Sequence, residues 1–437
     1  MSSVGVGAAA SATLYAVVSI PAQMGARPEG AHELEHHLEN GKGFRNPWDS
    51  FANLSIPKML WGGVLRKLTG TGNTPDTTPP TVPVIKPTFL PSRDINTPRL
   101  RATWLGHACF YVEFPGGLRV LFDPVFEDCC SPININALKR FTPPPCEIED
   151  LPVVDLVVIS HNHYDHLSYP TIKRIQKKYP DVHFFAPLGN KKWFEDCGVA
   201  NVTELDWWDT RHVSLELVKG KGMGSKEEKK KVDQVSITPS STEQSARSDG
   251  DAAAAAAEEE EHKSITAVVG ALPCQHVTAR TPFDKCRTLW SSWSIESGGA
   301  KVYFAGDTGY RSVPSVPPGT DDYGPAYAHL PVCPAFAQIG LLRGPFDLGL
   351  IPIGAYEPRW IMSPMHANPT DSVNIFLDTK CTRAIGMHWG TWVLTEEDVM
   401  EPPRKLKEAL ERKRLAKSVF EVVDIGESRE YGGNEEV

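Results

Sequence analysis

Three histidines and an aspartate fall within six consecutive residues, His161 to His166, directly after the apolar or small residues 156–160. The apolar run predicts a short buried strand, so the polar groups lie where the chain leaves it. Imidazole and carboxylate are ligands that zinc prefers, but four groups so close together cannot all reach one tetrahedral ion without strain. The spacing favours His161 and His163 on one metal ion and Asp165 and His166 on a second. The alternative is a loop that is merely rich in histidine, although the chain has only 14 histidines in 437 residues.

Three further candidate ligands follow predicted strands elsewhere in the chain. His276 comes after the strand 265–273, Asp307 after the strand 301–305 and His388 after the strand 383–387. Taken alone, either histidine would be read as an ordinary core or surface residue. Active-site residues, however, are commonly carried on loops that a rigid sheet holds in place. The four strand ends together therefore predict one metal centre.

The remaining pattern predicts a layered α/β protein. Residues 101–107, 109–114 and 118–122 form a predicted strand meander, and 182–187 and 202–205 are strands that alternate with helices at 169–179 and 191–197. Further helices are expected at 369–379 and 402–416, with a buried strand at 346–354. This alternation is typical of a layered α/β sandwich. Trp207 and Trp208 are expected in the core, although such adjacent rings also line lipid grooves.

Asp123 ends the meander, immediately before Pro124. Two interpretations are equally supported: the carboxylate supports a metal-ligating histidine from outside the metal site, or it caps a turn.

Composition bounds the function. The net charge of −9 and the pI near 5.9 argue against a nucleic-acid partner, which would normally meet a basic surface. Nine cysteines with no paired spacing predict reduced thiols in an intracellular protein. The motifs are spread over most of the chain, which predicts one catalytic domain at 99–437, preceded by a tail and Pro-rich arm at 1–98.

Several segments are expected outside the folded core. Residues 1–28 contain a single charge, Arg27, and predict a disordered or weakly membrane-associated tail. The apolar patch at 56–65 favours an arm that packs on the main domain over a surface that touches lipid. Residues 219–262, with a lysine cluster and six consecutive alanines, predict a disordered insertion. A Pro- and Gly-rich loop insertion is expected at 311–332.

The run His161 to His166 resembles the signature of the metallo-β-lactamase superfamily. Other stretches resemble, within it, the family of N-acyl-phosphatidylethanolamine-hydrolysing phospholipases D. These stretches are 46–48, 104–108, 204–208, 304–310, 352–360 and 388–391. The resemblance covers the chain from about Phe44 to near its C-terminus. It implies a metallo-β-lactamase αββα sandwich with an N-terminal arm and two loop insertions.

The resemblance also implies a ligand set and a reaction. One zinc ion would take His161, His163, His276 and Asp307, and the other Asp165, His166, Asp307 and His388, so that Asp307 bridges two Zn²⁺ ions. All seven positions match the family pattern. The implied reaction is hydrolysis of N-acyl-phosphatidylethanolamine to N-acylethanolamine and phosphatidic acid. Asp165 would hold the proton of the attacking hydroxide, and His366 would contact the phosphate or amide of the substrate. A surface-loop role for His366 stays open, and Tyr356, Glu357 and Arg359 are expected to shape the pocket or to bind one another.

Two alternatives remain at this point. The same metals could serve another substrate, such as a lactone or another phosphodiester, because a fold does not fix a reaction. The chain could also be an inactive lipid-binding homologue, although its complete ligand set argues against that. The expected partner is a membrane phospholipid, with peripheral membrane association and no nucleic acid, and a homodimer is left open. The expected location is intracellular, in the cytoplasm at a membrane, with a mitochondrial membrane as the alternative.

Overall fold

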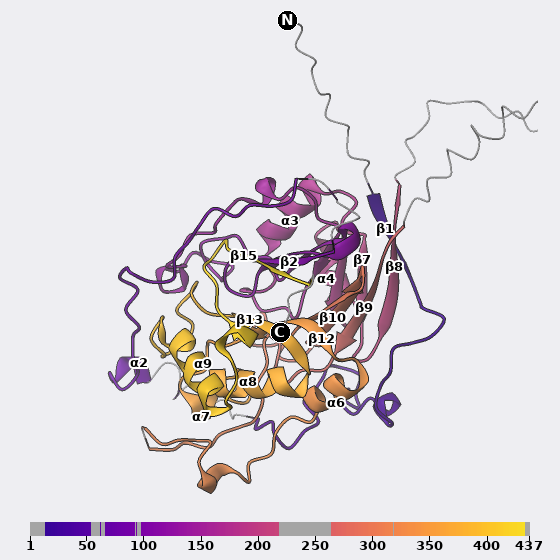
Figure 1. Ribbon diagram of the computed structural model, residues 1–437. Helices are drawn as coiled ribbons and strands as arrows, with labels where there is room; N and C mark the ends of the chain where they lie inside the picture. Colours follow the sequence, from indigo (N-terminus) through magenta and orange to yellow (C-terminus); the bar gives the residue numbers. More distant parts are fainter. Residues whose placement is uncertain are drawn as a thin grey trace, which may run out of the picture.

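The computed structural model describes residues 14–53, 62, 66–91, 93, 98–217, 264–317 and 319–432. Two mixed β-sheets pack against each other, and helices cover their outer faces (Figure 1). This arrangement is the αββα sandwich of the metallo-β-lactamase fold, as the sequence predicted.

One sheet carries the predicted meander. Its strand order is β15 (Ser428–Tyr431), β2 (Leu100–Trp104), β3 (Phe110–Glu113), β4 (Arg119–Phe122), β5 (Leu156–Val158), β6 (His183–Pro187) and β7 (Val202–Leu205). Helices α3 (Tyr169–Lys178) and α4 (Lys191–Asp196) cover its outer face. Side chains alternate along these strands: Val120 and Phe122 face the other sheet, whereas Leu121 packs with the helix layer.

The other sheet has the order β1 (Leu14–Ser19), β8 (Thr210–Leu217), β9 (Ile265–Leu272), β10 (Ser292–Ser297), β11 (Ala300–Phe304), β12 (Phe346–Pro352), β13 (Cys381–Met387) and β14 (Phe420–Glu421). Helices α6 (Ala335–Leu342), α7 (Arg359–Met362), α8 (Pro369–Asp378) and α9 (Glu401–Arg412) lie on its side of the molecule (Figure 1). The three-residue helix α2 (Arg66–Leu68) belongs to the arm.

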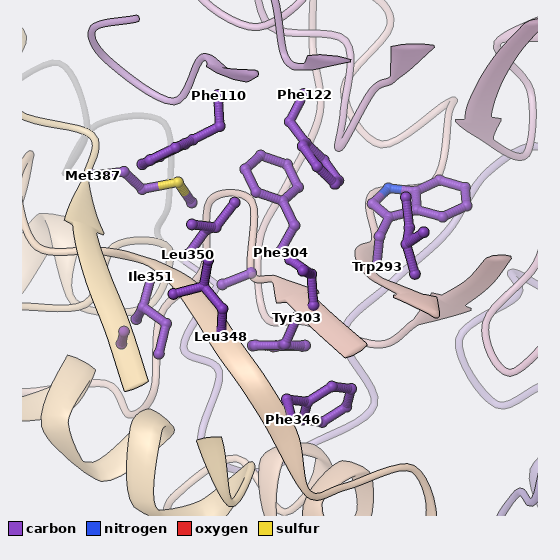
Figure 2. Packing of buried hydrophobic residues seen from close by; sticks show 14 of the residues in the cluster. Phe110, Phe122, Trp293, Tyr303, Phe304, Phe346, Leu348, Leu350, Ile351 and Met387 are labelled. Atoms are coloured by element: carbon purple, nitrogen blue, oxygen red, sulfur yellow. The ribbon is translucent and has the colours of Figure 1, made fainter. Parts of the chain in front are cut away.

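Aromatic side chains fill the space between the sheets. Figure 2 shows Phe110 and Phe122 from one sheet above Phe304 and Leu350 from the other. The rings of Phe122 and Phe304 lie 4.8 Å apart between centroids. Because both sheets bury continuous apolar surface here, the strand ends that leave this core are held firmly.

The expectation of a tail over residues 1–28 is wrong for Leu14–Ser19. This segment forms β1 and pairs antiparallel with β8, in a register that places Leu14 opposite Leu217. Leu14, Ala16 and Val18 pack against the core. The segment is apolar, and it becomes a strand because β8 offers it an edge, a distant partner that its own sequence does not reveal.

Other expectations fall partly outside the described residues. The insertion 219–262 and nearly all of the patch 56–65 lie there, and so does the lysine cluster. The described part of 311–332 forms a loop whose one regular element is a 3₁₀ turn, Pro325–Tyr327. The domain boundary between residues 98 and 99 stays a prediction. Among the described residues, no helix is long and apolar enough to cross a lipid bilayer.

Candidate metal centre

The predicted ligands meet at one rim of the sandwich. β5 leads into the loop 161–166, β9 into His276, β11 into Asp307 and β13 into His388. The parallel strands β4 to β6 and β11 to β13 end at this rim, so residues more than 200 positions apart become neighbours. Five of the seven are buried, and His163 and Asp165 are partly exposed at the open side.

One group of ligand atoms comprises three imidazoles. His161 Nε2 lies 2.9 Å from His163 Nδ1, which lies 3.4 Å from His276 Nε2. Asp307 Oδ2 lies 3.8 Å from Nε2 of both His161 and His276. These spacings are those of donors that face a common centre, and they bring together the residues that the resemblance assigned to one ion.

The second group lies on the other side of Asp307. His166 Nε2 is 3.2 Å from both His388 Nε2 and Asp307 Oδ2. Asp307 Oδ1 lies 3.0 Å from His388 Nε2, and Asp165 Oδ2 lies 3.4 Å from His166 Nε2. Asp307 therefore contacts both groups: Oδ2 lies near His161 and His276, and Oδ1 lies beside His388. A carboxylate that bridges two metal ions requires this position.

Protein atoms outside the two groups fix the imidazole rings. Asp123 Oδ2 accepts a hydrogen bond from His166 Nδ1 at 2.7 Å, and Ser160 donates its backbone N–H to Asp123 Oδ1 at 2.7 Å. The carbonyl of Met365 accepts from His276 Nδ1 at 2.9 Å. Such contacts leave each Nε2 atom directed inward. Of the two interpretations of Asp123, the contact with His166 supports the first.

His107 belongs to the second group, although the sequence did not single it out. Its Nε2 lies 3.0 Å from Asp165 Oδ2, and its ring centroid lies 4.1 Å from that of His388. Its backbone carbonyl accepts from the N–H of His388 at 3.0 Å. The available signal was its place after the strand β2, in the 104–108 stretch that resembles the family. His107 holds a ligand carboxylate and a ligand backbone at once.

Several residues at this rim have left-handed backbone conformations. His107, Asp123 and His388 have φ values of 50°, 38° and 63°, which non-glycine residues rarely adopt. Gly306, at φ 58°, precedes Asp307, and a Cβ atom there would lie 2.6 Å from the Cβ of Ser160. Strain of this kind persists only where surrounding structure imposes it, and it is commonly found at functional sites.

The protonation states fit a cation site. Burial alone would raise the pKa of Asp307, but neighbouring His166 and His388 lower it well below its usual range. Burial and the neighbouring imidazoles lower the pKa of His161 well below 6.5. Against burial, Asp307 raises the pKa of His388 to about 9. The carboxylates here are thus balanced by positive charge on neighbouring imidazoles. A divalent metal ion supplies that positive charge instead when ionised carboxylates and neutral imidazoles bind it.

Two buried polar atoms support the same conclusion. Asp307 Oδ1 and His366 Nδ1 are buried without a hydrogen bond of good geometry, although His388 Nε2 lies 3.0 Å from Asp307 Oδ1. Polar atoms without a partner are costly to bury, so the residues present fit a bound metal ion. His366 Nδ1 lies 3.9 Å from Asp307 Oδ2, beside the predicted ligands, and its contact with a substrate stays a prediction.

Tyr356, Glu357 and Arg359 lie beside a separate cavity of about 950 Å³ between the loop 314–323 and α9. Tyr356 donates to Glu401, and Arg359 pairs with Asp322 and Asp371 at 3.0 and 2.9 Å. The backbone N–H of Arg359 donates to Glu357. These side chains bind one another and their neighbours and do not reach the ligand atoms.

The N-terminal arm also reaches the centre. Asn46 Nδ2 donates to the carbonyl of His276 at 2.8 Å, and Ser50 donates to Gln275 at 2.6 Å. The Trp207 and Trp208 side chains are buried in the core, as expected, and Trp48 from the arm stacks on Trp207 at 5.3 Å. The arm therefore supports the segment that carries one predicted ligand.

Comparison with known protein families agrees with the fold. The beta-lactamase superfamily domain profile matches residues 118–263 and 223–389. A metallo hydrolase of Ignicoccus hospitalis, 17% identical, covers 77% of this chain and is itself covered completely, with a TM-score of 0.43. A possible metal-dependent hydrolase of Veillonella parvula, 14% identical, covers 75% of this chain and is covered over 98% of its own length, with a TM-score of 0.45. The fold and the site define a metal-dependent hydrolase of the metallo-β-lactamase superfamily.

The sequence comparison narrows this class. The N-acyl-phosphatidylethanolamine-hydrolyzing phospholipase D 1 of Caenorhabditis elegans is 34% identical over 413 residues, which are 90% of this chain and 94% of that protein. The mitochondrial enzyme of the same name from Saccharomyces cerevisiae is 29% identical over 307 residues, which are 70% of this chain and half of that protein. The chain belongs to the N-acyl-phosphatidylethanolamine-hydrolysing phospholipase D family.

Proposed function

We propose that the chain hydrolyses N-acyl-phosphatidylethanolamine, with two zinc ions, to N-acylethanolamine and phosphatidic acid. The observation that carries the substrate is the 34% identity, over nearly the full length, to a relative named for this reaction. The geometry supports two metal ions, because Asp307 contacts both groups of imidazoles.

The residues at the rim have distinct tasks. His161, His163 and His276 would hold one zinc ion, and Asp165, His166 and His388 the other, with Asp307 between them. Bound there, zinc supplies a nucleophilic water near neutral pH and polarises a phosphoryl oxygen. Asp165 is partly exposed at the open side and would hold the proton of the attacking water. His366 presents an unpartnered Nδ1 atom to a phosphate or amide oxygen.

The substrate is a bilayer lipid, so we propose that the enzyme acts at a membrane surface without spanning it. The name of the yeast relative makes a mitochondrial membrane the first compartment to test. Fractionation of cells that express the tagged chain, followed by a salt wash of the membrane pellet, measures both points.

The decisive assay offers purified protein N-acyl-phosphatidylethanolamine vesicles and, separately, a lactone panel, with and without chelator. We expect release of N-acylethanolamine that stops with chelator and returns with zinc. Chelator-sensitive lactone cleavage without N-acylethanolamine release would contradict the lipid assignment. Release by His161→Ala would contradict the metal mechanism. His212→Ala, a partly exposed residue of β8 between β1 and β9, serves as the matched control.

A further inference from the structure

A second cluster of metal-binding side chains lies outside the predicted metal centre, where the N-terminal arm meets the end of β7. His36 Nε2 lies 2.6 Å from Asp206 Oδ1, and His37 Nε2 lies 2.7 Å from Asp206 Oδ2. The three side chains offer ligand atoms within 4.8 Å of one another. We propose that His36, His37 and Asp206 bind a further divalent transition-metal ion, such as zinc, which joins the arm to the catalytic domain.

The rings are held with their Nε2 atoms on the carboxylate. Leu34 adopts a left-handed conformation at φ 51°, which turns the chain so that two consecutive histidines reach one side chain. The ring of His36 stacks on Trp207 at 4.2 Å between centroids, and that of His37 contacts Phe44 edge-on at 5.0 Å. Imidazoles fixed in this way lose little further freedom when they bind a metal.

The carboxylate is fixed as well. The backbone N–H of Trp207 donates to Asp206 Oδ1 at 2.7 Å. Burial alone would raise the pKa of Asp206, but His36 and His37 lower it, so the group is ionised near neutral pH. An ionised carboxylate and two neutral imidazoles are the forms that zinc binds.

Only small changes separate the hydrogen-bonded cluster from a metal site. A neutral imidazole that donates from Nε2 exposes a lone pair there once its proton moves to Nδ1, with no change in net charge. Tetrahedral zinc with bonds of about 2.0–2.1 Å places its ligand atoms roughly 3.3 Å apart. The nitrogen and oxygen atoms would separate by about 0.6–0.7 Å, a shift that the partly exposed side chains of His37 and Asp206 can make.

Room for further ligands lies next to the cluster. A cavity of about 540 Å³ is bounded by residues 28–36 together with Trp48, Trp207 and Trp208, and His36 is part of its wall. Glu29, Glu33 and Glu35 also face it, which favours entry of a cation. Three protein ligands leave a coordination position open to water from this cavity.

The position of the cluster gives the ion a structural task. Beyond His37 the arm continues to Phe44, whose N–H donates to the carbonyl of Cys286 at 2.8 Å, and to Asn46, which holds the carbonyl of His276. An ion at His36 and His37 would therefore fix a segment that supports the predicted metal centre. This inference does not depend on the identity of the substrate.

The test counts metal ions on the full chain. Wild type, His37→Gln and Asp206→Asn are dialysed to equilibrium against zinc and analysed for zinc per chain, with His212→Gln as the control. We expect both cluster variants to bind one zinc fewer than wild type and the control to bind the same number. The comparison is a difference, so it holds whatever the occupancy of the predicted metal centre.

His37→Gln is the variant that protects the test against misfolding. The His37 side chain is 31% exposed, and its replacement leaves the contact between His36 and Asp206 intact. Its circular dichroism spectrum should match that of wild type. Equal zinc content in wild type and folded His37→Gln would overturn the proposal and make the cluster a hydrogen-bonded contact alone.

Discussion

The rim contains charged and polar side chains, whereas the core beneath it contains apolar ones. Between the sheets, rings such as Phe122 and Phe304 pack on one another and need no further partner. At the rim, buried carboxylates and imidazoles have mainly one another as partners, although isolated charges are costly to bury. The apolar core therefore holds the strand ends, and with them the charged groups, in place before any metal binds.

Four buried tryptophans connect the two regions. Each places its ring in the core and donates its indole N–H to a backbone carbonyl at or shortly before a residue of the rim. Trp293 donates to Ile159, Trp290 to Cys274, Trp104 to His107 and Trp389 to Gly386. A buried ring with one polar atom suits this task, because its packing fixes the direction of the hydrogen bond.

The largest effect is expected for Asp307→Asn. The substitution keeps the size of the side chain but removes the negative charge that contacts both groups. We expect zinc binding and hydrolysis to fall by more than the 10–100-fold that is typical of residues outside the ligand set. Zinc titration and single-turnover assays measure this. Asp347→Asn, exposed at the opposite end of β12, should behave as wild type.

The converse change is Phe346→Ala, in the core at the end of β12 away from the rim. Phe346 is 1% exposed and packs on Tyr303 at 5.4 Å between centroids. Truncating a buried phenylalanine typically destabilises a fold by about 3–5 kcal/mol. Denaturant unfolding should show this loss, while zinc affinity of the folded protein stays unchanged. A parallel loss of zinc affinity would show that the two regions are not separable.

His107→Gln tests the residue that the sequence analysis missed. The variant loses the imidazole that contacts Asp165 and packs on His388, whereas the backbone hydrogen bond to His388 remains. We expect a 10–100-fold loss of zinc affinity for one ion and little change for the other. Stepwise zinc titration distinguishes the two. An equal loss at both ions would mean that His107 supports the whole rim.

The smallest effect is expected for Glu357→Gln, a partly buried carboxylate away from the ligand atoms. Burial raises the pKa of Glu357 to about 7 from 4.5. Between these values the folded state keeps a proton that the unfolded state releases, so stability falls as pH rises through this window. The glutamine variant avoids this loss and still accepts from Arg359. It should exceed wild type by about 1–2 kcal/mol at pH 8, since one pKa unit corresponds to about 1.4 kcal/mol and partial exposure weakens the effect.

Unfolding in urea at pH 5 and pH 8 measures this difference, which should be larger at pH 8. Glu408→Gln is the control, because its exposed carboxylate has a pKa that Lys405 lowers. Equal stability of wild type and Glu357→Gln at both pH values would show that a carboxylate buried without a metal carries no penalty here.

Local patterns predicted most of the elements near the rim. The helix expected at 369–379 is α8, whose N-terminus is fixed by a capping box between Asn368 and Asp371. The helix expected at 402–416 is α9, but it ends at Arg412 because Arg414 turns into a left-handed conformation. Helix ends of this kind depend on single backbone angles that periodicity does not reveal.

Pairing over long distances was not predictable. β1 and β8 are separated by almost 200 residues, and neither was recognised as a strand. Likewise, His107 shows the strand-end position of His276 and His388 and lies in a stretch that resembles the family, but neither signal identifies its contact with Asp165. Their roles depend on neighbours that only the folded chain provides.

The sequence by itself determined the chemistry available to this protein. Apolar runs that end in histidine or aspartate specify both the strands and the groups that leave them, since burial and polarity are properties of each short segment. The tertiary structure alone decided which groups meet. Parallel strands of two sheets brought Asp307 between His161 and His388. The tertiary structure also brought His107, Asp123 and the arm into contact with predicted ligands. Contacts among distant segments follow from packing and not from spacing along the chain.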